Sequence, residues 1–214
     1  MRLLITGTDS GVGKTWVACA LARALRAAGK QVVAIKPVEA GCTGPPSDRE
    51  DGVQLARATG QAEPAHAIVR SGEPVTEIDF DALVVKIERW SEGVEYTLIE
   101  GVGGLLTPVT WEWNMADVVR ALGAAALVVG VDRLGTVNHT LLTLSVLELA
   151  GIHRVGVVLT DPETTDLTTG SNAAAIARLS GIDRILTLPR GNADQAARLI
   201  VPAIAWLGEV ATPA

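Results

Sequence analysis

The sequence has few cysteines, few aromatic residues and no run of basic residues. Its 214 residues include two Cys, one Tyr and one Phe beside five Trp, and the formal net charge is −6. The cysteines, Cys19 and Cys42, lie far apart and fit no C-x-x-C or metal-binding pattern, which favours a reducing, cytoplasmic environment. The lack of a basic run argues against a nucleic-acid partner, and the apolar runs are too short to span a membrane. No signal peptide is expected, because an apolar strand pattern begins within the first residues.

A glycine-rich segment, TGTDSGVGKTW at 6–16, follows the apolar run at 3–5 and precedes a helical pattern. The strict phosphate-binding pattern G-x-x-x-x-G-K-[ST] would place its first glycine at position 8, which is Thr8. Gly7 stands one residue early, so the segment is a variant of this P-loop. The alternative is a glycine-rich turn with a chance Lys-Thr pair, which is disfavoured because strand, loop and helix come in the required order.

The residues of this segment suit a nucleotide phosphate. Gly11 and Gly13 lack a Cβ and let the backbone curl closely around an anion. The amides at the start of the following helix have no partners within it and attract negative charge. Lys14 can reach the outer phosphates, and the Thr15 hydroxyl can bind Mg²⁺. The segment therefore predicts a site for a nucleoside triphosphate and its metal ion.

Apolar strand patterns alternate with helical patterns along the chain. This alternation predicts an α/β fold, with a doubly wound, mainly parallel sheet flanked by helices as in P-loop NTPases. Because no repeat or linker interrupts it, one domain is expected over 1–214. Strands are expected at 3–5, 31–37, 96–101, 125–131, 154–160 and 184–189, and helices at 14–28, 50–59, 79–91, 115–122, 137–150, 172–180 and 193–207.

Lys36 closes the strand at 31–37 and is followed by Pro37, which is expected to end that strand sharply. Ligands of parallel sheets bind at the carboxyl ends of the strands. Lys14 and Lys36 would therefore face one crevice, which suits a substrate with several negative oxygens. The alternative is a surface lysine whose apolar stem packs along the sheet.

Acidic residues stand at two other places where the crevice is expected. Glu100 closes the strand at 96–101, where a carboxylate can hold Mg²⁺ opposite Thr15; alternatively, it is a capping or surface glutamate. Asp51 opens a helix and can complete the metal site, or it only stabilises the helix dipole. Asp48 competes with Asp51 for the metal-binding role.

Two segments predict a contact surface between copies of the chain. Glycines after Glu100 offer bare backbone for close approach, and the apolar stretch LLTPVTWEW that follows is unusual for a free loop. The alternative is that its tryptophans fold back on their own sheet. The residues concerned are Gly101, Gly103, Gly104, Leu105, Leu106, Trp111 and Trp113.

Asn138 and His139 lie in the first turn of the helix expected at 137–150. His139 invites a catalytic interpretation, but no Ser or Cys nucleophile accompanies it in a triad-like setting. A structural or interface role for His139 is therefore preferred.

Four blocks, TGTDSGVGKT, KPVEAG, EGVGGLLTP and LGTVNHTLLT, together resemble the dethiobiotin synthetase family. The resemblance runs from residue 3 to about 160. It implies a ligase of biotin biosynthesis that uses ATP, or another nucleoside triphosphate, with Mg²⁺. Such a cyclo-ligase closes the ureido ring on 7,8-diaminopelargonic acid and CO₂ or bicarbonate, through a carbamate and a carbamic-phosphoric anhydride. A cytoplasmic homodimer is also implied.

The resemblance also implies roles for individual residues. Lys14, Lys36 and Ser10 would be catalytic, and Thr15, Asp51 and Glu100 would bind the metal ion. Asn138 would meet the carboxylate tail of the substrate across the dimer interface. The nucleotide would contact Thr8, Asp9, Gly11, Val12, Gly13, Lys14, Thr15, Thr160 and Pro189. The substrate would contact Ser10, Lys36, Ala40, Gly103 and Asn138.

The chain departs from the family pattern at three places. Ala40 stands where the family usually has Ser or Thr, so a hydroxyl contact is lost unless Thr43 replaces it. Thr160 stands where the family often has an Asn that contacts the base. The stretch between Gly60 and Pro74 is shorter than usual, so that part of the substrate wall is trimmed or comes from elsewhere.

Other enzymes and switches of related fold are the rival interpretations. Partitioning-type ATPases carry K-G-G-x-G-K-T, and their first lysine would fall at Asp9, whose carboxylate cannot hold a phosphate. Such a switch would also need a basic face for DNA or an anionic membrane. A small-molecule kinase or a cobalamin-pathway amidase is the other rival, and a kinase would leave phosphate on its product.

Overall fold

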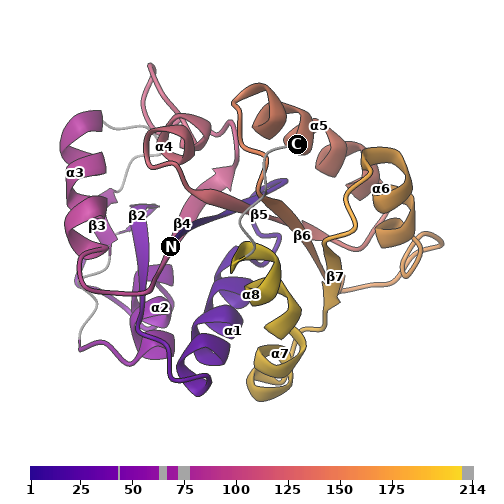
Figure 1. Ribbon diagram of the computed structural model, residues 1–214, viewed down its shortest axis with the longest axis horizontal. Coiled ribbons are helices and arrows are strands. Elements are labelled where there is room, and N and C mark those ends of the chain that lie inside the picture. The colour runs from indigo at the N-terminus through magenta and orange to yellow at the C-terminus, as the bar shows by residue number, and fades with distance from the viewer. Residues whose placement is uncertain (43, 63–66, 72–77, 209–214) are drawn as a thin grey trace.

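The computed structural model describes residues 1–42, 44–62, 67–71 and 78–208. Its strands form one seven-stranded sheet in the order β3-β2-β4-β1-β5-β6-β7, and every neighbouring pair is parallel (Figure 1). The strands are β1 (Arg2–Gly7), β2 (Val32–Ala40), β3 (Ala67–Ser71), β4 (Tyr96–Gly104), β5 (Ala125–Val131), β6 (Val155–Thr160) and β7 (Ile185–Leu188). The buried strands are rich in Val, Leu, Ile and Ala, as expected of strands that helices cover on both faces.

Helices cover both faces of this sheet (Figure 1). On one face lie α1 (Lys14–Ala27), α2 (Asp51–Thr59), α7 (Ala193–Leu199) and α8 (Val201–Gly208). On the other lie α3 (Phe80–Trp90), α4 (Met115–Ala121), α5 (Thr136–Leu149) and α6 (Asn172–Ser180). Each layer contributes its own buried apolar cluster, and Cys19, on the inner face of α1, is buried in one of them.

The predicted strands and helices are found in the structure, with three corrections. Pro37 does not end its strand: the ladder between β2 and β4 ends at Ile35, so the missing N–H of Pro37 costs no bond to β4, and β2 continues beside β3. The edge strand β3 was not predicted, because its sequence is short and follows no clear alternation. The helix expected at 193–207 is two helices that meet at Ile200.

The apolar stretch after β4 divides between core and surface. Leu105 is buried in the core, and Trp113 packs edge-on against Phe80 with their ring centroids 5.0 Å apart. Leu106 and Trp111 are exposed, Trp111 by 90%. The alternative of folding back therefore holds for Trp113 but not for Trp111.

Candidate active site

The phosphate loop joins β1 to α1 and folds tightly over Gly7. Gly11 and Gly13 have φ values of 70° and 98°, in the left-handed region that favours glycine. A Cβ at Gly7 would lie 2.6 Å from the Asp9 carbonyl oxygen and 3.1 Å from Lys14 Nζ. The Lys14 ammonium donates to that same carbonyl at 3.1 Å. A side chain at position 7 would therefore clash with the loop itself, which explains why the variant loop has its first glycine there.

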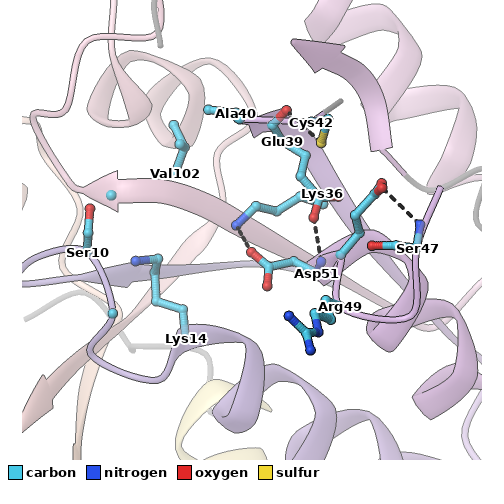
Figure 2. A pocket seen from close by; sticks show the side chains of 14 residues that line it. Ser10, Lys14, Lys36, Glu39, Ala40, Cys42, Ser47, Arg49, Asp51 and Val102 are labelled. Carbon is cyan, nitrogen blue, oxygen red and sulfur yellow. Dashed lines mark hydrogen bonds and ion pairs between the residues drawn. The ribbon is translucent and has the colours of Figure 1, made fainter. Parts of the chain in front are cut away.

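Four elements bring one hydroxyl, one ammonium and two carboxylates together beside this loop. The Thr15 hydroxyl lies 2.8 Å from Asp51 Oδ1 and 2.9 Å from Glu100 Oε1, and it donates its proton to one of them at a time. Lys36 Nζ lies 2.8 Å from Asp51 Oδ2, 2.8 Å from Glu100 Oε1 and 3.1 Å from the Gly101 carbonyl oxygen. Figure 2 shows Lys36 extended from β2 toward Asp51. The structure thus brings together residues that are far apart in the sequence.

Burial shapes the charges of this cluster, in which two carboxylates share the Lys36 ammonium. Burial raises the pKa of Glu100, which is 1% exposed, and the nearby ammonium only partly offsets this. Burial alone would lower the pKa of Lys36, but the charges of Glu100 and Asp51 raise it, and burial alone would raise the pKa of Asp51, but the charge of Lys36 lowers it. Burial and the charge of Lys36 lower the pKa of Lys14 to about 8.

The oxygen atoms of the cluster fit a magnesium ion. A hydroxyl and two carboxylates are the kind of ligand that Mg²⁺ prefers. Among the described residues, Glu100 Oε2 is a buried oxygen without a hydrogen-bond partner, which leaves it a lone pair for a cation or its water. Asp48 lies outside this cluster, because it is exposed and pairs with Arg57 at 2.6 Å. The geometry therefore favours Asp51 over Asp48.

A polar crevice of about 460 Å³ lies over the cluster, and the term "crevice" below refers to this space. The predicted residues Ser10, Lys14, Lys36, Ala40 and Gly103 all line it. Sequence reasoning missed seven other lining residues, and four of them carry an ionisable side chain. Strand alternation would place residues 36 and 39 on opposite faces, and the other three of these four lie in a loop and at a helix start without a motif of their own. The ionisable residues missed are Glu39, Cys42, Arg49 and Glu50, and the others are Gly41, Ser47 and Val102.

Thr160 holds the phosphate loop by a side-chain hydrogen bond. Its side chain is fully buried, and its hydroxyl donates to the Val12 carbonyl at 2.8 Å. The Pro189 carbonyl accepts a hydrogen bond from Trp16 Nε1 at 3.1 Å. Arg190, which sequence reasoning missed, donates from Nη2 to the Gly11 carbonyl at 3.4 Å. A direct contact of Thr160 or Pro189 with a base stays a prediction, and the hydroxyl of Thr160 is already engaged.

A second hollow of about 280 Å³, called the apolar hollow below, lies between the phosphate loop and α5. Thr8 and Asp9, which were assigned to the nucleotide, line this hollow and not the crevice. Asn138 is exposed in the first turn of α5 and does not line the crevice of its own chain. The hollow is lined by Thr8, Asp9, Gly104, Leu105, Leu106, Thr107, His139, Leu142, Thr143 and Val146.

Known proteins of similar sequence identify the family of the chain. A protein-family model described as an AAA domain matches residues 1–196. ATP-dependent dethiobiotin synthetase BioD of Anaeromyxobacter dehalogenans (strain 2CP-C) is 42% identical over 202 residues, covering 87% of this chain and 89% of that protein. Proteins of the same name from Aquifex aeolicus and Rhodococcus jostii are 34% and 35% identical and cover 85% and 89% of this chain, and 86% and 87% of their own. The chain belongs to the dethiobiotin synthetase family.

Solved structures confirm the predicted fold of the family member. The cell division protein FtsY of Thermotoga maritima has a TM-score of 0.59 at 20% identity, covering 94% of this chain and 68% of that chain. A nucleotide-binding protein of Archaeoglobus fulgidus in complex with ADP has a TM-score of 0.56 at 16% identity, covering 97% and 90%. At such identities the likeness shows the fold alone. Among the described residues, no helix has the length and apolar character to cross a membrane.

Of the departures from the dethiobiotin synthetase pattern, Thr160 is buried beside the phosphate loop, and Ala40 belongs to the crevice. Ala40 lines it and offers only a methyl group where the family usually has a hydroxyl. Thr43, the candidate replacement, lies outside the described residues, as does part of the shortened stretch between Gly60 and Pro74. The thiol of Cys42, which lines the same crevice, donates to the Glu39 carbonyl at 3.4 Å.

Proposed function

We propose that this chain closes the ureido ring of dethiobiotin from 7,8-diaminopelargonic acid and CO₂ or bicarbonate, with ATP and Mg²⁺. The observation that carries the proposal is the meeting of Lys14 and Lys36 at one crevice, beside the oxygen atoms of Thr15, Asp51 and Glu100. Two cations and a metal site suit a reaction in which a carbamate and a triphosphate must approach each other.

The proposed reaction has three steps, and each of them moves charge among the reacting groups. An amine of the substrate and CO₂ form a carbamate with loss of a proton, and a carbamate oxygen attacks the γ-phosphorus of ATP as ADP leaves. The second amine then attacks the carbonyl carbon of the carbamic-phosphoric anhydride, closes the ring and expels phosphate. Mg²⁺, when bound by Thr15, Asp51 and Glu100, offsets charge on the phosphates.

The residues of the chain position and stabilise these groups. Lys14 balances the charge of the outer phosphates at the loop, and Lys36, on the facing strand, balances the carbamate oxygens. Ser10, Ala40 and Gly103 line the space left for the substrate. Of these, Ser10 supplies a hydroxyl group, and the missing Cβ of Gly103 lets the Thr107 side chain pack against the backbone there.

The active unit is proposed to be a cytoplasmic homodimer. Leu106 and Leu142, at the apolar hollow, are 56% and 59% exposed in a single chain. Asn138 lies one helical turn before Leu142 and shares its face of α5. A second copy covering these leucines would place Asn138 and the start of α5 beside the substrate carboxylate of its neighbour. Such an interface should bury more than ~1,000 Å².

Product analysis tests the proposal directly. The protein would be incubated with diaminopelargonate, carbon-labelled bicarbonate, Mg²⁺ and ATP, and the products examined by mass spectrometry. Dethiobiotin that carries the label, with free phosphate released in equal amount, is the expected result. The Lys36→Ala variant is the matched control and should form far less. A phosphorylated product without ring closure would identify a kinase instead.

A further inference from the structure

Glu39, near the end of β2, bonds to the start of another element. Its side chain is buried, and its carboxylate accepts hydrogen bonds from the backbone amides of Asp51 and Gly52, the latter at 3.1 Å. Figure 2 shows the bond that runs from Glu39 to the Asp51 amide at the edge of the crevice. Glu39 thus caps α2, although it lies on strand β2 and not among the residues just before the helix.

The residue that precedes α2 does not provide this cap. Glu50 makes no side-chain bond to the amides of its own helix. Its carboxylate is instead held by Arg70, through Nε at 2.8 Å and Nη2 at 2.7 Å, and by the Ser47 amide at 2.9 Å. Without Glu39, the first amides of α2 would therefore have no side-chain acceptor among the described residues.

The first residue of α2 is Asp51, whose carboxylate meets Thr15 and Lys36 at 2.8 Å each. A carboxylate group reaches only a short way from its backbone, so the place of the first turn fixes the place of its oxygens. We propose that Glu39 is a positioning residue, which holds the start of α2 so that Asp51 meets Thr15 in the magnesium site. This inference rests on the use of Mg²⁺ in the proposed function.

The demands of the metal make this position important. Mg²⁺ requires near-ideal octahedral geometry with ligands at ~2.0–2.1 Å, so small shifts of one carboxylate weaken binding. Removing a group that orients a metal ligand typically costs ~10- to 100-fold in metal affinity. The same loss is expected when Glu39 is truncated, although the proposal assigns Glu39 to the helix start and not to the metal ion.

The test measures how much Mg²⁺ strengthens nucleotide binding. Calorimetry would give the affinity for a non-hydrolysable ATP analogue with Mg²⁺ and with EDTA, and the ratio of the two is the contribution of the metal. In Glu39→Ala this ratio should fall ~10-fold or more, while the affinity in EDTA stays unchanged. Glu39→Gln, which keeps the shape and one acceptor oxygen, should lose part of the ratio and guards against misfolding of the alanine variant.

Gly60→Ala is the matched control, because it disturbs α2 at its other end. Gly60 has φ 72°, and a Cβ there would lie 2.6 Å from the Arg26 guanidinium. This variant should unfold at a lower temperature and keep the wild-type ratio. The positioning role is overturned if Glu39→Ala keeps the ratio, or if Gly60→Ala loses as much of it. A wild-type protein whose affinity ignores Mg²⁺ would instead refute the metal site of the proposed function itself.

Discussion

The crevice and the apolar hollow both border the phosphate loop, but they differ in whether their side chains have partners within the chain. In the crevice, the Lys36 ammonium pairs with two carboxylates of its own chain, at 2.8 Å each. In the hollow, Leu106 and Leu142 leave more than half of their surface exposed. The charges of one region are therefore paired within a single chain, whereas the other region presents an apolar surface that the proposed second copy would cover.

The difference follows from the free-energy cost of leaving a buried charge unpaired or an apolar side chain exposed. A buried charge without a partner costs several kcal/mol, so the chain must pair it locally. Exposed apolar side chains cost far less and are common at contact surfaces. Variants in the two regions should therefore separate catalysis from assembly.

The largest effect is expected from the two lysines of the crevice. Lys14→Ala and Lys36→Ala should each lower turnover by ~10²-fold or more, because each removes a positioned charge at the transition state. Lys30→Ala is the matched control, since Lys30 pairs with Glu95 on the surface, and its turnover should be unchanged. Near wild-type turnover in both crevice variants would show that neither lysine serves the reaction.

A smaller effect is expected at the carboxylates. Glu100→Gln keeps the shape of a proposed Mg²⁺ ligand and removes its charge, so the Mg²⁺ concentration for half-maximal turnover should rise ~10-fold or more. Asp48→Asn should leave it unchanged, because Asp48 pairs with Arg57 on the surface. If Asp48→Asn were the more damaging change, the assignment of Asp51 and Glu100 would be wrong.

Leu142→Glu should weaken the proposed dimer and leave the charge pairs of the crevice intact. Covering one leucine contributes ~1.5–3 kcal/mol, so its loss should weaken dimer formation at least ~10-fold. Sedimentation over a range of protein concentrations would measure this change. Leu179→Glu, on the exposed part of α6, is the control and should sediment like the wild type. A wild-type protein that stays monomeric at micromolar concentration and still makes dethiobiotin at full rate would contradict the shared site.

The smallest effect concerns the two cysteines. Burial raises the pKa of Cys19 to about 12, and it raises the pKa of Cys42 above its usual value as well. Because the thiolate is the reactive form, a maleimide at pH 8 should modify the native protein slowly, at Cys42 before Cys19. Mass spectrometry of digested samples would give the order, and denatured protein should lose the preference. Faster labelling of Cys19 would contradict its burial on the inner face of α1.

Most of the fold could be predicted because its signals are local. Apolar strands, glycine-rich turns and helical spacing each occupy a short stretch, and P-loop segments have a strict order of strand, loop and helix. The wrong predictions concern features that a neighbouring strand determines. Pro37 is tolerated inside β2 because the ladder between β2 and β4 has already ended. The edge strand β3 is specified mainly by the strand it joins.

The sequence by itself determined which side chains come to the carboxyl side of the sheet, since Lys14 stands where the loop meets its helix, and Lys36 and Glu100 each follow the apolar run of a strand. Only the tertiary structure decided how they pair. It brought Asp51, and not Asp48, to Thr15 and Lys36, placed Thr160 against the loop, and brought Glu39 to the start of a helix on another element. These contacts join residues distant in the chain, and their geometry depends on how the layers pack, which no local pattern encodes.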